Sequence, residues 1–224
     1  LALNLPSTYE VPSLPDTPVF RDEQVLNSLR LAIRAAKMIT PQYVIGAPGT
    51  GRTTFVQAVH KASCPDKPLI AIDCRTANVN AESDGLTGEL FGGDNNSSFL
   101  IETGGMLVLE DLSEATGRAS EQLAQLSNRL LQHKSSAKWS IIVTENDDPK
   151  EAAHWSKFVS MTFSKLRQLE FQLPALKERS DASLIAVSMM ARLSTDHQLS
   201  RSAIDAIFDL HAPNTFYDLE KLLT

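Results

Sequence analysis

The sequence predicts a three-layer α/β sandwich with a parallel sheet, followed by a small helical lid at its C-terminal end. Short apolar runs rich in Val, Ile and Leu alternate with helical stretches from residue 43 to residue 171, as in parallel sheets that helices cover on both faces. From Ser180 onward the strand pattern stops and only helical stretches remain. The 224 residues, 42% of them hydrophobic, are enough to bury the core of such a domain.

The first part of the chain is expected to be a linker followed by a helix. Residues 1–18 carry prolines at positions 6, 12, 15 and 18, which prevent a continuous helix and predict an extended linker along the domain surface. Apolar residues then recur at helical spacing from Val25 to Ala36 behind two acidic residues, and Thr40-Pro41 ends the pattern.

Five apolar runs are expected to form the sheet, because near-continuous aliphatic runs are typical of strands buried on both faces. They are residues 43–45, 69–72, 106–109, 141–143 and 169–171. The helices expected between them are 52–63, 86–91 and 118–133, and those expected in the lid are 181–193, 200–210 and 216–223.

Charge and composition limit the partners of this segment. The 27 acidic and 21 basic residues give a net charge of -6, without the basic surplus of a surface that binds a phosphate backbone. No apolar run approaches the roughly 18 residues of a membrane span, and the first residues lack the basic region of a signal peptide. Cys64 and Cys74 match no metal or redox spacing. We therefore expect a cytoplasmic protein with two reduced cysteines and no membrane contact.

A glycine-rich segment follows the first predicted strand and opens a predicted helix. It reads Gly46-Ala47-Pro48-Gly49-Thr50-Gly51-Arg52-Thr53, the strand–loop–helix setting that a phosphate-binding P-loop requires. Glycines let backbone N–H groups turn inward, and the helix N-terminus adds positive potential where phosphates lie. The alternative is an ordinary glycine-rich turn. The predicted nucleotide-binding residues are Gly46, Gly49, Thr50, Gly51, Arg52 and Thr53.

Arg52 stands where the P-loop pattern has lysine. A guanidinium keeps the positive charge but is bulkier and planar, so it cannot slide between β- and γ-phosphates as an ammonium does. Nucleotide binding is compatible with this change, whereas efficient hydrolysis is not expected.

Landmarks along residues 19–224 resemble the AAA+ domain of bacterial enhancer-binding proteins, the NtrC type that remodels the RpoN-type sigma factor. Besides the P-loop they include residues 70–74, Gly-Glu-Leu-Phe-Gly at 88–92, residues 99–112, residues 141–147, Leu-Pro-Ala-Leu-Lys-Glu-Arg at 173–179 and residues 213–220. The resemblance implies a three-layer P-loop AAA+ sandwich. It divides the chain into a linker (1–18), an α/β nucleotide-binding subdomain (19–172) and a helical lid subdomain (173–224).

Departures from the family bear on catalysis. Only residues 93–98 separate Gly92 from Phe99, too few for the family's G-A-F-T-G-A loop that touches the sigma factor. The family's Asp-Glu pair at the Walker B strand end is reversed here, as Glu110-Asp111. The exchange moves each carboxylate by more than about 1 Å, a shift that can cost on the order of 10²-fold in rate. We expect Thr53 and Glu110 to hold any Mg²⁺.

The family's remaining catalytic groups are mostly replaced. Alignment places its two trans-acting arginines at Val159 and Lys165 and its lid arginine at Tyr217. Because an arginine finger contributes about 10³–10⁵ in turnover, hydrolysis should be feeble. Asn146 matches the family's sensor asparagine, and its alternative is a simple turn residue before Asp147. Glu110, Asp111 and Asn146 thus form the expected, degenerate catalytic set.

Among these regulators the sequence most resembles the divergent kind typified by VpsR, which acts with ordinary sigma factors, and relatives that sense cyclic di-GMP. Readers of cyclic di-GMP in the family carry an arginine motif before the first AAA+ helix, where Phe20-Arg21 stands here. Arg21 could donate two hydrogen bonds to guanine or phosphate with Phe20 stacking nearby; alternatively, Phe20 is a core anchor and Arg21 a surface charge. A further family arginine corresponds to Gln57.

The resemblance also implies partners outside this segment. It implies a response-regulator-like domain before the chain and a DNA-binding helix-turn-helix after it, contact with RNA polymerase through the full-length activator, and self-association. The absence of an initial Met and the helical pattern at the end likewise suggest a fragment. Glu178, Arg179 and Asp181 are expected to form a solvated cluster at a helix start.

Three functions remain open at this point. The first is a regulatory module that binds ATP or cyclic di-GMP and sets the oligomeric state of an activator. The second is an active AAA+ ATPase that remodels the transcription machinery, and the third is an inert dimerisation scaffold. Zinc and hydrolase chemistry find no support, because no His-carboxylate spacing or nucleophile elbow occurs.

Overall fold

The computed structural model describes residues 21–75, 104–115, 117–132, 138–146, 156–193 and 199–224. The expected linker at 1–18, the helix at 86–91, Phe20 and the segment 88–98 lie outside these residues.

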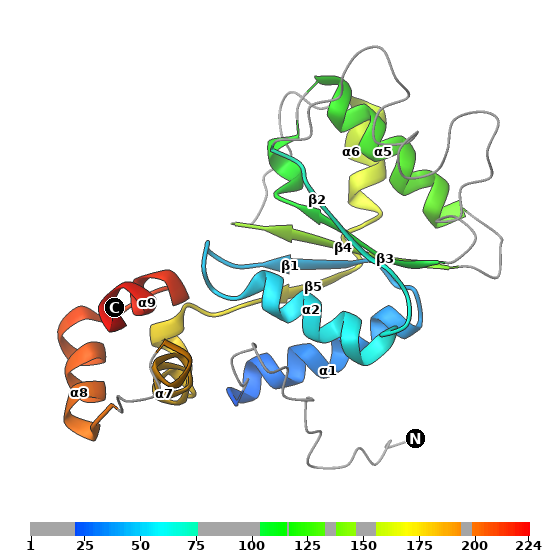
Figure 1. The fold of residues 1–224 in the computed structure, drawn as a ribbon. Helices are drawn as coiled ribbons and strands as arrows, with labels where there is room; N and C mark the ends of the chain where they lie inside the picture. Colours follow the sequence, from blue (N-terminus) through cyan, green and yellow to red (C-terminus); the bar gives the residue numbers. More distant parts are fainter. Residues whose placement is uncertain (1–20, 76–103, 116, 133–137, 147–155, 194–198) are drawn as a thin grey trace.

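The centre of the molecule is a parallel sheet in the order β2-β3-β4-β1-β5 (Figure 1). Its register pairs, for example, Val44 with Thr144 and with Phe171, and Ile72 with Leu109. Each strand contains one of the five predicted apolar runs, so the predicted parallel sheet is confirmed. The strands are β1 Gln42–Ile45, β2 Leu69–Asp73, β3 Gly105–Glu110, β4 Trp139–Glu145 and β5 Leu169–Gln172.

Helices cover both faces of this sheet, which confirms the three-layer architecture. On one face α1 (Glu23–Lys37) and α2 (Arg52–Ser63) pack on the sheet through a core that includes Leu29 and Phe55. On the other face α5 (Gly117–Gln132) and α6 (Lys157–Ser164) form a second core, which includes Leu126 and Phe163 (Figure 1). The interior strands β3 and β4 are buried almost throughout, as their unbroken apolar sequences require.

Local capping explains where two of these helices begin. The Asp22 carboxylate accepts a hydrogen bond from the N–H of Val25 at the start of α1, and the Ser156 hydroxyl accepts one from the N–H of Val159 at the start of α6. The predicted α2 is observed with the same bounds, and α5 begins one residue earlier than predicted. Helix α6 was not predicted from the sequence.

Beyond β5 the chain forms the helical lid. It contains α7 (Ala182–Leu193), α8 (Arg201–Ala206), a short π-helical segment (Ile207–His211) and α9 (Phe216–Leu223). The helices pack around a small core of their own, which includes Ile185 and Leu219 together with Leu176 from the turn before them. The 3-10 turn η2 (Leu176–Glu178) joins the lid to the sheet, and η1 (Leu112–Glu114) follows β3.

The expected solvated cluster at the start of α7 is wrong for two of its three members. The side chains of Arg179 and Asp181 are each 1% exposed and form an ion pair at 2.8 Å. Asp181 also accepts hydrogen bonds from the backbone N–H groups of Arg21 and Asp22. Asp181 thus joins the start of α7 to the start of α1, a contact between residues about 160 positions apart.

Two general expectations can be compared with the structure. Both cysteines are free, and Cys74 is buried behind β2. Within the ranges that the structure describes, no helix has the length and apolarity needed to cross a bilayer.

Candidate nucleotide site

The loop between β1 and α2 turns sharply at two glycines. Gly49 and Gly51 have φ values of 78° and 96°, in the left-handed region that other residues rarely adopt, and Gly51 is the N-cap of α2. The hydroxyl of Thr50 donates to the carbonyl of Ala47 at 2.8 Å, which closes the turn. The loop therefore has the compact form in which backbone N–H groups gather beside the N-terminus of the following helix, as in phosphate-binding loops.

The lid presses directly on this loop. The N–H of Phe216 donates to the Gly49 carbonyl at 2.8 Å. A Cβ atom on Gly51 would come within 2.7 Å of the Phe216 ring, and one on Gly49 would come within 2.7 Å of Thr215 and Tyr217. The glycines thus allow both the turn and the close approach of α9.

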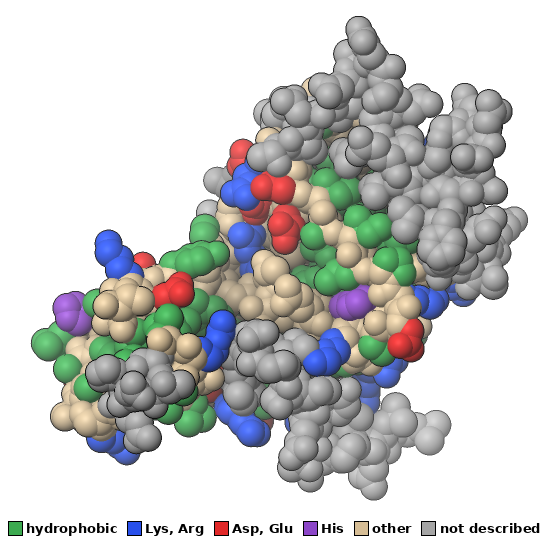
Figure 2. Space-filling view, in the orientation of Figure 1, with side chains coloured by type: hydrophobic (Ala, Val, Ile, Leu, Met, Phe, Trp, Pro, Cys, Tyr) green, Lys and Arg blue, Asp and Glu red, His purple; other side chains and the backbone are tan. Residues whose placement is uncertain are grey.

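An open cleft of about 860 Å³ lies between the P-loop, the carboxyl ends of the strands and the lid. Figure 2 shows basic and acidic side chains beside one another above the lid, whose visible face mixes hydrophobic, charged and other side chains. Seven predicted site residues line the cleft: Gly49, Gly51, Arg52, Thr53, Glu110, Asp111 and Asn146. The lid contributes Met189, Arg192, Leu193, Phe216, Tyr217 and Glu220.

The other two predicted P-loop residues lie on the opposite side of the loop. Gly46 and Thr50 line a second cavity of about 580 Å³, which Asn146 also borders. The loop therefore separates two cavities, of which the larger faces the lid.

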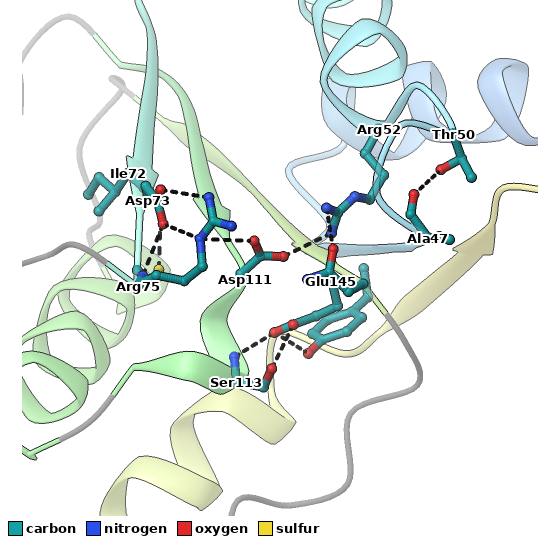
Figure 3. Close-up of polar contacts among 12 residues, drawn as sticks. Ala47, Thr50, Arg52, Ile72, Asp73, Arg75, Asp111, Ser113 and Glu145 are labelled. Carbon is teal, nitrogen blue, oxygen red and sulfur yellow. Dashed lines mark hydrogen bonds and ion pairs between the residues drawn. The ribbon is translucent and has the colours of Figure 1, made fainter. Parts of the chain in front are cut away.

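Arg52 extends from the start of α2 across the cleft to the ends of two strands (Figure 3). Its guanidinium donates to the Asp111 carboxylate at 2.9 Å and to the Asn146 side-chain oxygen at 2.5 Å. These partners are 59 and 94 residues away in the sequence, and the parallel sheet brings them to one edge. The residue in the lysine position is therefore bonded to two of the three residues expected to act in catalysis.

A second arginine, which the sequence did not single out, reaches the same carboxylate. Arg75 follows β2 and holds Asp73 through two hydrogen bonds, at 3.0 and 2.8 Å. Its Nε also lies 3.3 Å from the second oxygen of Asp111. The hydrogen bonds that Arg75 donates to Asp73, together with the charges of Asp73 and Asp111, raise the pKa of Arg75 further above its usual value, so it stays charged. Asp111 is thus held between two guanidinium groups.

The backbone at Asp111 is also unusual. Its φ and ψ are 51° and 52°, a left-handed conformation that costs about 1 kcal/mol or more outside glycine. Its N–H donates to the carbonyl of Thr144 at 2.7 Å, which fixes the turn against β4. The carboxylate is therefore positioned by the backbone as well as by its two arginines.

Glu145, the last residue of β4, forms hydrogen bonds with the turn that follows β3. It is 1% exposed and accepts hydrogen bonds from the N–H and hydroxyl of Ser113, at 2.6 and 2.8 Å, and from the Tyr43 hydroxyl at 3.3 Å (Figure 3). Burial raises the pKa of Glu145, and its three hydrogen bonds offset this only in part. These hydrogen bonds hold Glu145 in place, and Glu145 directly precedes Asn146 in the chain.

The candidate metal ligands Thr53 and Glu110 both line the cleft, Thr53 exposed and Glu110 half-buried. Across the described ranges, no three His, Cys, Asp or Glu side chains are grouped as metal ligands would be. The neighbouring Asp111 does not fit a divalent cation, because each of its oxygens already faces a guanidinium. Of these three residues, Glu110 and Thr53 remain able to meet such an ion.

The three positions aligned with the family's arginines differ from one another in exposure and in their distance from the cleft. Val159 is fully buried in α6 and packs in the core, so a side chain there does not reach outward. Lys165 is exposed at the end of α6, and Tyr217 is exposed at the lid edge of the cleft. The one arginine that the described lid residues bring to the cleft is Arg192, on α7.

Arg21, the described member of the proposed cyclic di-GMP pair, lies outside this cleft. Its N–H is held by Asp181 at 2.6 Å and the residue is exposed. It borders neither of the two cavities.

Sequence comparison relates this chain to bacterial transcription regulators. A family model described as the Sigma-54 interaction domain matches residues 19–172. The regulatory protein LuxO of Vibrio vulnificus is 25% identical over 200 residues, which cover 81% of this chain and 44% of that protein. The Nif-specific regulatory protein of Rhizobium etli is 23% identical over 227 residues, covering 92% and 37%. The chain thus spans less than half the length of these relatives.

Comparison with solved structures supports the fold. NtrX from Brucella abortus in complex with ATP superposes with a TM-score of 0.65 at 18% identity, covering 89% of this chain and 50% of that one. Domain III of the replication initiation protein DnaA from Thermotoga maritima gives a TM-score of 0.62 at 15% identity, covering 89% and 81%.

Proposed function

This chain belongs to the sigma-54 interaction domain family, and from that premise we propose that it is a regulatory nucleotide-binding module of a transcriptional activator. It binds ATP or ADP in the cleft beneath the lid, turns ATP over slowly if at all, and uses the bound ligand to set how copies of the regulator assemble.

One observation supports slow turnover above all: Arg52 pairs with Asp111 and Asn146. Asp111 stands in the position of the family's water-polarising glutamate. A carboxylate whose two oxygens each face a guanidinium is poorly placed to act as a base, because these contacts take up the oxygens that would accept a proton from water. The residues that should act on water are instead bonded to one another.

The missing arginines support the same conclusion. Val159 is buried and Tyr217 carries no charge, so neither position supplies the cation that stabilises a transferring phosphoryl group, and Lys165 keeps a positive charge without the guanidinium fork. Such a residue contributes about 10³–10⁵ in turnover.

The cleft itself favours a mononucleotide as the first ligand. Its volume of about 860 Å³ lies within the range of small-molecule sites. The cleft combines the glycine loop and arginines, which suit phosphates, with apolar lid residues, which suit a base. The ATP complex of NtrX, a protein of the same fold, is consistent with this choice.

Cyclic di-GMP is the second candidate ligand, at Phe20-Arg21. The observation in its favour is the exposed position of Arg21 at the start of α1, where its backbone is anchored to the lid through Asp181. A ligand there could shift the lid relative to α1.

We further propose that the regulator acts without the RpoN-type sigma factor. The segment between Gly92 and Phe99 holds only six residues, too few for the family's sigma-contacting loop. The full-length protein would then contact RNA polymerase and DNA through other domains. Pull-down with purified RpoN-type sigma factor tests this directly: retention that depends on nucleotide would contradict it.

Isothermal titration with ATP, ADP and cyclic di-GMP tests ligand binding, and a phosphate-release assay at high protein concentration tests turnover. We expect micromolar-class binding of at least one nucleotide and phosphate release that Arg52→Ala leaves unchanged. Robust release that Arg52→Ala abolishes would favour an active ATPase. No heat signal with any of the three ligands, in a folded sample, would favour an inert scaffold.

A further inference from the structure

We propose that this cleft binds nucleotide phosphates without a divalent cation, because Arg52 and Arg75 supply the positive charge that Mg²⁺ brings elsewhere. The inference rests on the proposed nucleotide-binding function and adds that the nucleotide binds without a Mg²⁺ ion.

The first step is the position of Asp111 between the two arginines. Arg52 Nη1 lies 2.9 Å from one carboxylate oxygen, and Arg75 Nε lies 3.3 Å from the other (Figure 3). The Asp111 side chain is only 4% exposed, so its carboxylate and the pair with Arg52 are largely shielded from solvent, whereas Arg75 reaches it from a half-exposed position. A carboxylate in this arrangement already has its counter-charges and does not need a metal ion.

The second step is the charge balance at the strand ends. Arg52 and Arg75 carry two positive charges, and Asp73 and Asp111, which they contact, carry two negative charges. Because these charges are already paired, an added Mg²⁺ would have to displace a guanidinium to reach either carboxylate. Among the described residues, Glu110 is the one strand-end carboxylate of the cleft that takes part in no ion pair, and Mg²⁺ requires near-octahedral oxygen ligation that a single carboxylate does not supply.

The third step is the donor geometry. A guanidinium presents a planar fork of N–H groups that matches two phosphate oxygens, and it binds phosphate well in a partly buried setting. Arg75 is anchored by two hydrogen bonds to Asp73 yet is 55% exposed and lines the cleft, so it meets an incoming ligand without being rebuilt. Arg52 is rooted at the N-terminus of α2, where the helix dipole also favours phosphate.

The lid completes this arrangement from the opposite wall. Arg192 of α7 borders the same cleft, so three arginines surround the space and no metal ion is needed to bridge phosphate oxygens. The chain thus provides cations from α2, from the end of β2 and from the lid.

The test is a titration of ADP and of ATP into the protein, once in excess Mg²⁺ and once in excess EDTA. We expect the two dissociation constants to agree within about threefold for each nucleotide. Weakening by about tenfold or more in EDTA would overturn the inference while leaving the proposed function standing. Absence of binding in both buffers would remove the proposed function, and this inference with it.

Arg75→Ala tests the role assigned to the second guanidinium. The side chain is half exposed, so its loss should leave the fold intact, which a thermal melt of the free protein checks. We expect binding in EDTA to weaken about tenfold and Mg²⁺ to recover most of the loss, because one Asp111 oxygen becomes available to a cation. The ratio of the dissociation constant in EDTA to that in Mg²⁺ therefore rises.

Arg75→Lys and Arg201→Ala complete the set. Lysine keeps the charge without the fork, so we expect an intermediate ratio. Arg201 is 94% exposed on α8 and outside the cleft, and its replacement should leave both constants unchanged. An Arg75→Ala protein whose ratio equals that of the Arg201→Ala control would show that Mg²⁺ is not replaced by Arg75.

Discussion

Glu145 illustrates how a single buried carboxyl group couples the site to pH. Burial raises its pKa, and the hydrogen bonds from Ser113 and Tyr43 only partly oppose the shift. The folded-state pKa therefore lies above the unfolded value of 4.5. The contribution of this group to stability is complete below pH 4.5 and is lost as pH rises through the folded-state pKa.

Glu145→Gln should remove this dependence, because glutamine keeps an oxygen for Ser113 and cannot ionise. We expect the free energy of unfolding of the variant to increase relative to that of wild type as pH rises above 4.5. The limiting slope of this difference is about 1.4 kcal/mol per pH unit. Urea denaturation at a series of pH values measures it.

Glu114→Gln is the matched control, since Glu114 is an exposed carboxyl on the turn that Glu145 supports. Its stability difference from wild type should stay flat over the same range. Parallel curves for wild type and Glu145→Gln would contradict the assigned origin of the pKa shift.

At this scale the sequence is informative where contacts are local. The P-loop residues could be predicted because their spacing, their glycines and the following helix lie within one short segment. Arg75 and Glu145 could not, because their roles depend on Asp111, Ser113 and Tyr43, which only the sheet brings near. The one available signal was that both stand at or just beyond the carboxyl end of a predicted strand, where open α/β sheets form sites.

The contact between α9 and the P-loop shows how an element can depend on one glycine. Gly51 has φ of 96°, and a methyl group there would lie 2.7 Å from the Phe216 ring. We expect Gly51→Ala to destabilise the protein by about 2–4 kcal/mol, from left-handed backbone strain together with displacement of α9. Equilibrium denaturation measures the loss.

Gly117→Ala is a suitable comparison, because Gly117 also has positive φ, 52°, but no atom lies within 4 Å of an added methyl group. It should cost only about 1 kcal/mol. Phe216→Leu in the Gly51→Ala background should recover part of the loss if overlap with the ring contributes. Equal losses for the two glycine variants, without recovery by Phe216→Leu, would show that the lid contact contributes nothing.

Prediction of elements succeeded for the buried strands and failed for α6. Strands such as Met106–Leu109 are unbroken aliphatic runs, for which burial on both faces leaves few alternatives. Helix α6 is short, and residues 158–163 are rich in aromatic and β-branched side chains of low helix propensity. Its helical form comes from the Ser156 cap and from packing beside α5 rather than from its own sequence preference.

The arrangement of the whole molecule was less accessible to sequence analysis. Alternating strands and helices predicted a parallel sheet, but the order β2-β3-β4-β1-β5 depends on how each crossover packs, which periodicity does not record. The boundary at residue 172 between sandwich and lid stays a prediction. The burial of Arg179 and Asp181 was missed because nothing in a charged helix start indicates a long-range contact with Arg21 and Asp22.

That buried pair connects three parts of the chain. Asp181 holds the N–H groups of Arg21 and Asp22, Arg179 pairs with Asp181, and the Arg179 guanidinium lies 5.7 Å from the centre of the Phe216 ring. Phe216 in turn lies against Gly51 of the P-loop. The start of α1, the lid and the phosphate loop are therefore linked through one continuous set of contacts.

Breaking this link should loosen the whole molecule rather than one helix. In Asp181→Asn, Arg179 loses its carboxylate partner within a buried site, and the expected loss of unfolding free energy is about 3 kcal/mol. Because Phe216 depends on Arg179, the variant should also bind nucleotide more weakly than wild type. Asp205→Asn is the control, since Asp205 is exposed and pairs with Arg201 at 3.9 Å, so its removal should cost about 0.5 kcal/mol or less. Urea denaturation and nucleotide titration of both variants decide the matter: if Asp181→Asn lost stability but kept full affinity, the lid would dock on the P-loop independently of the segment before α1.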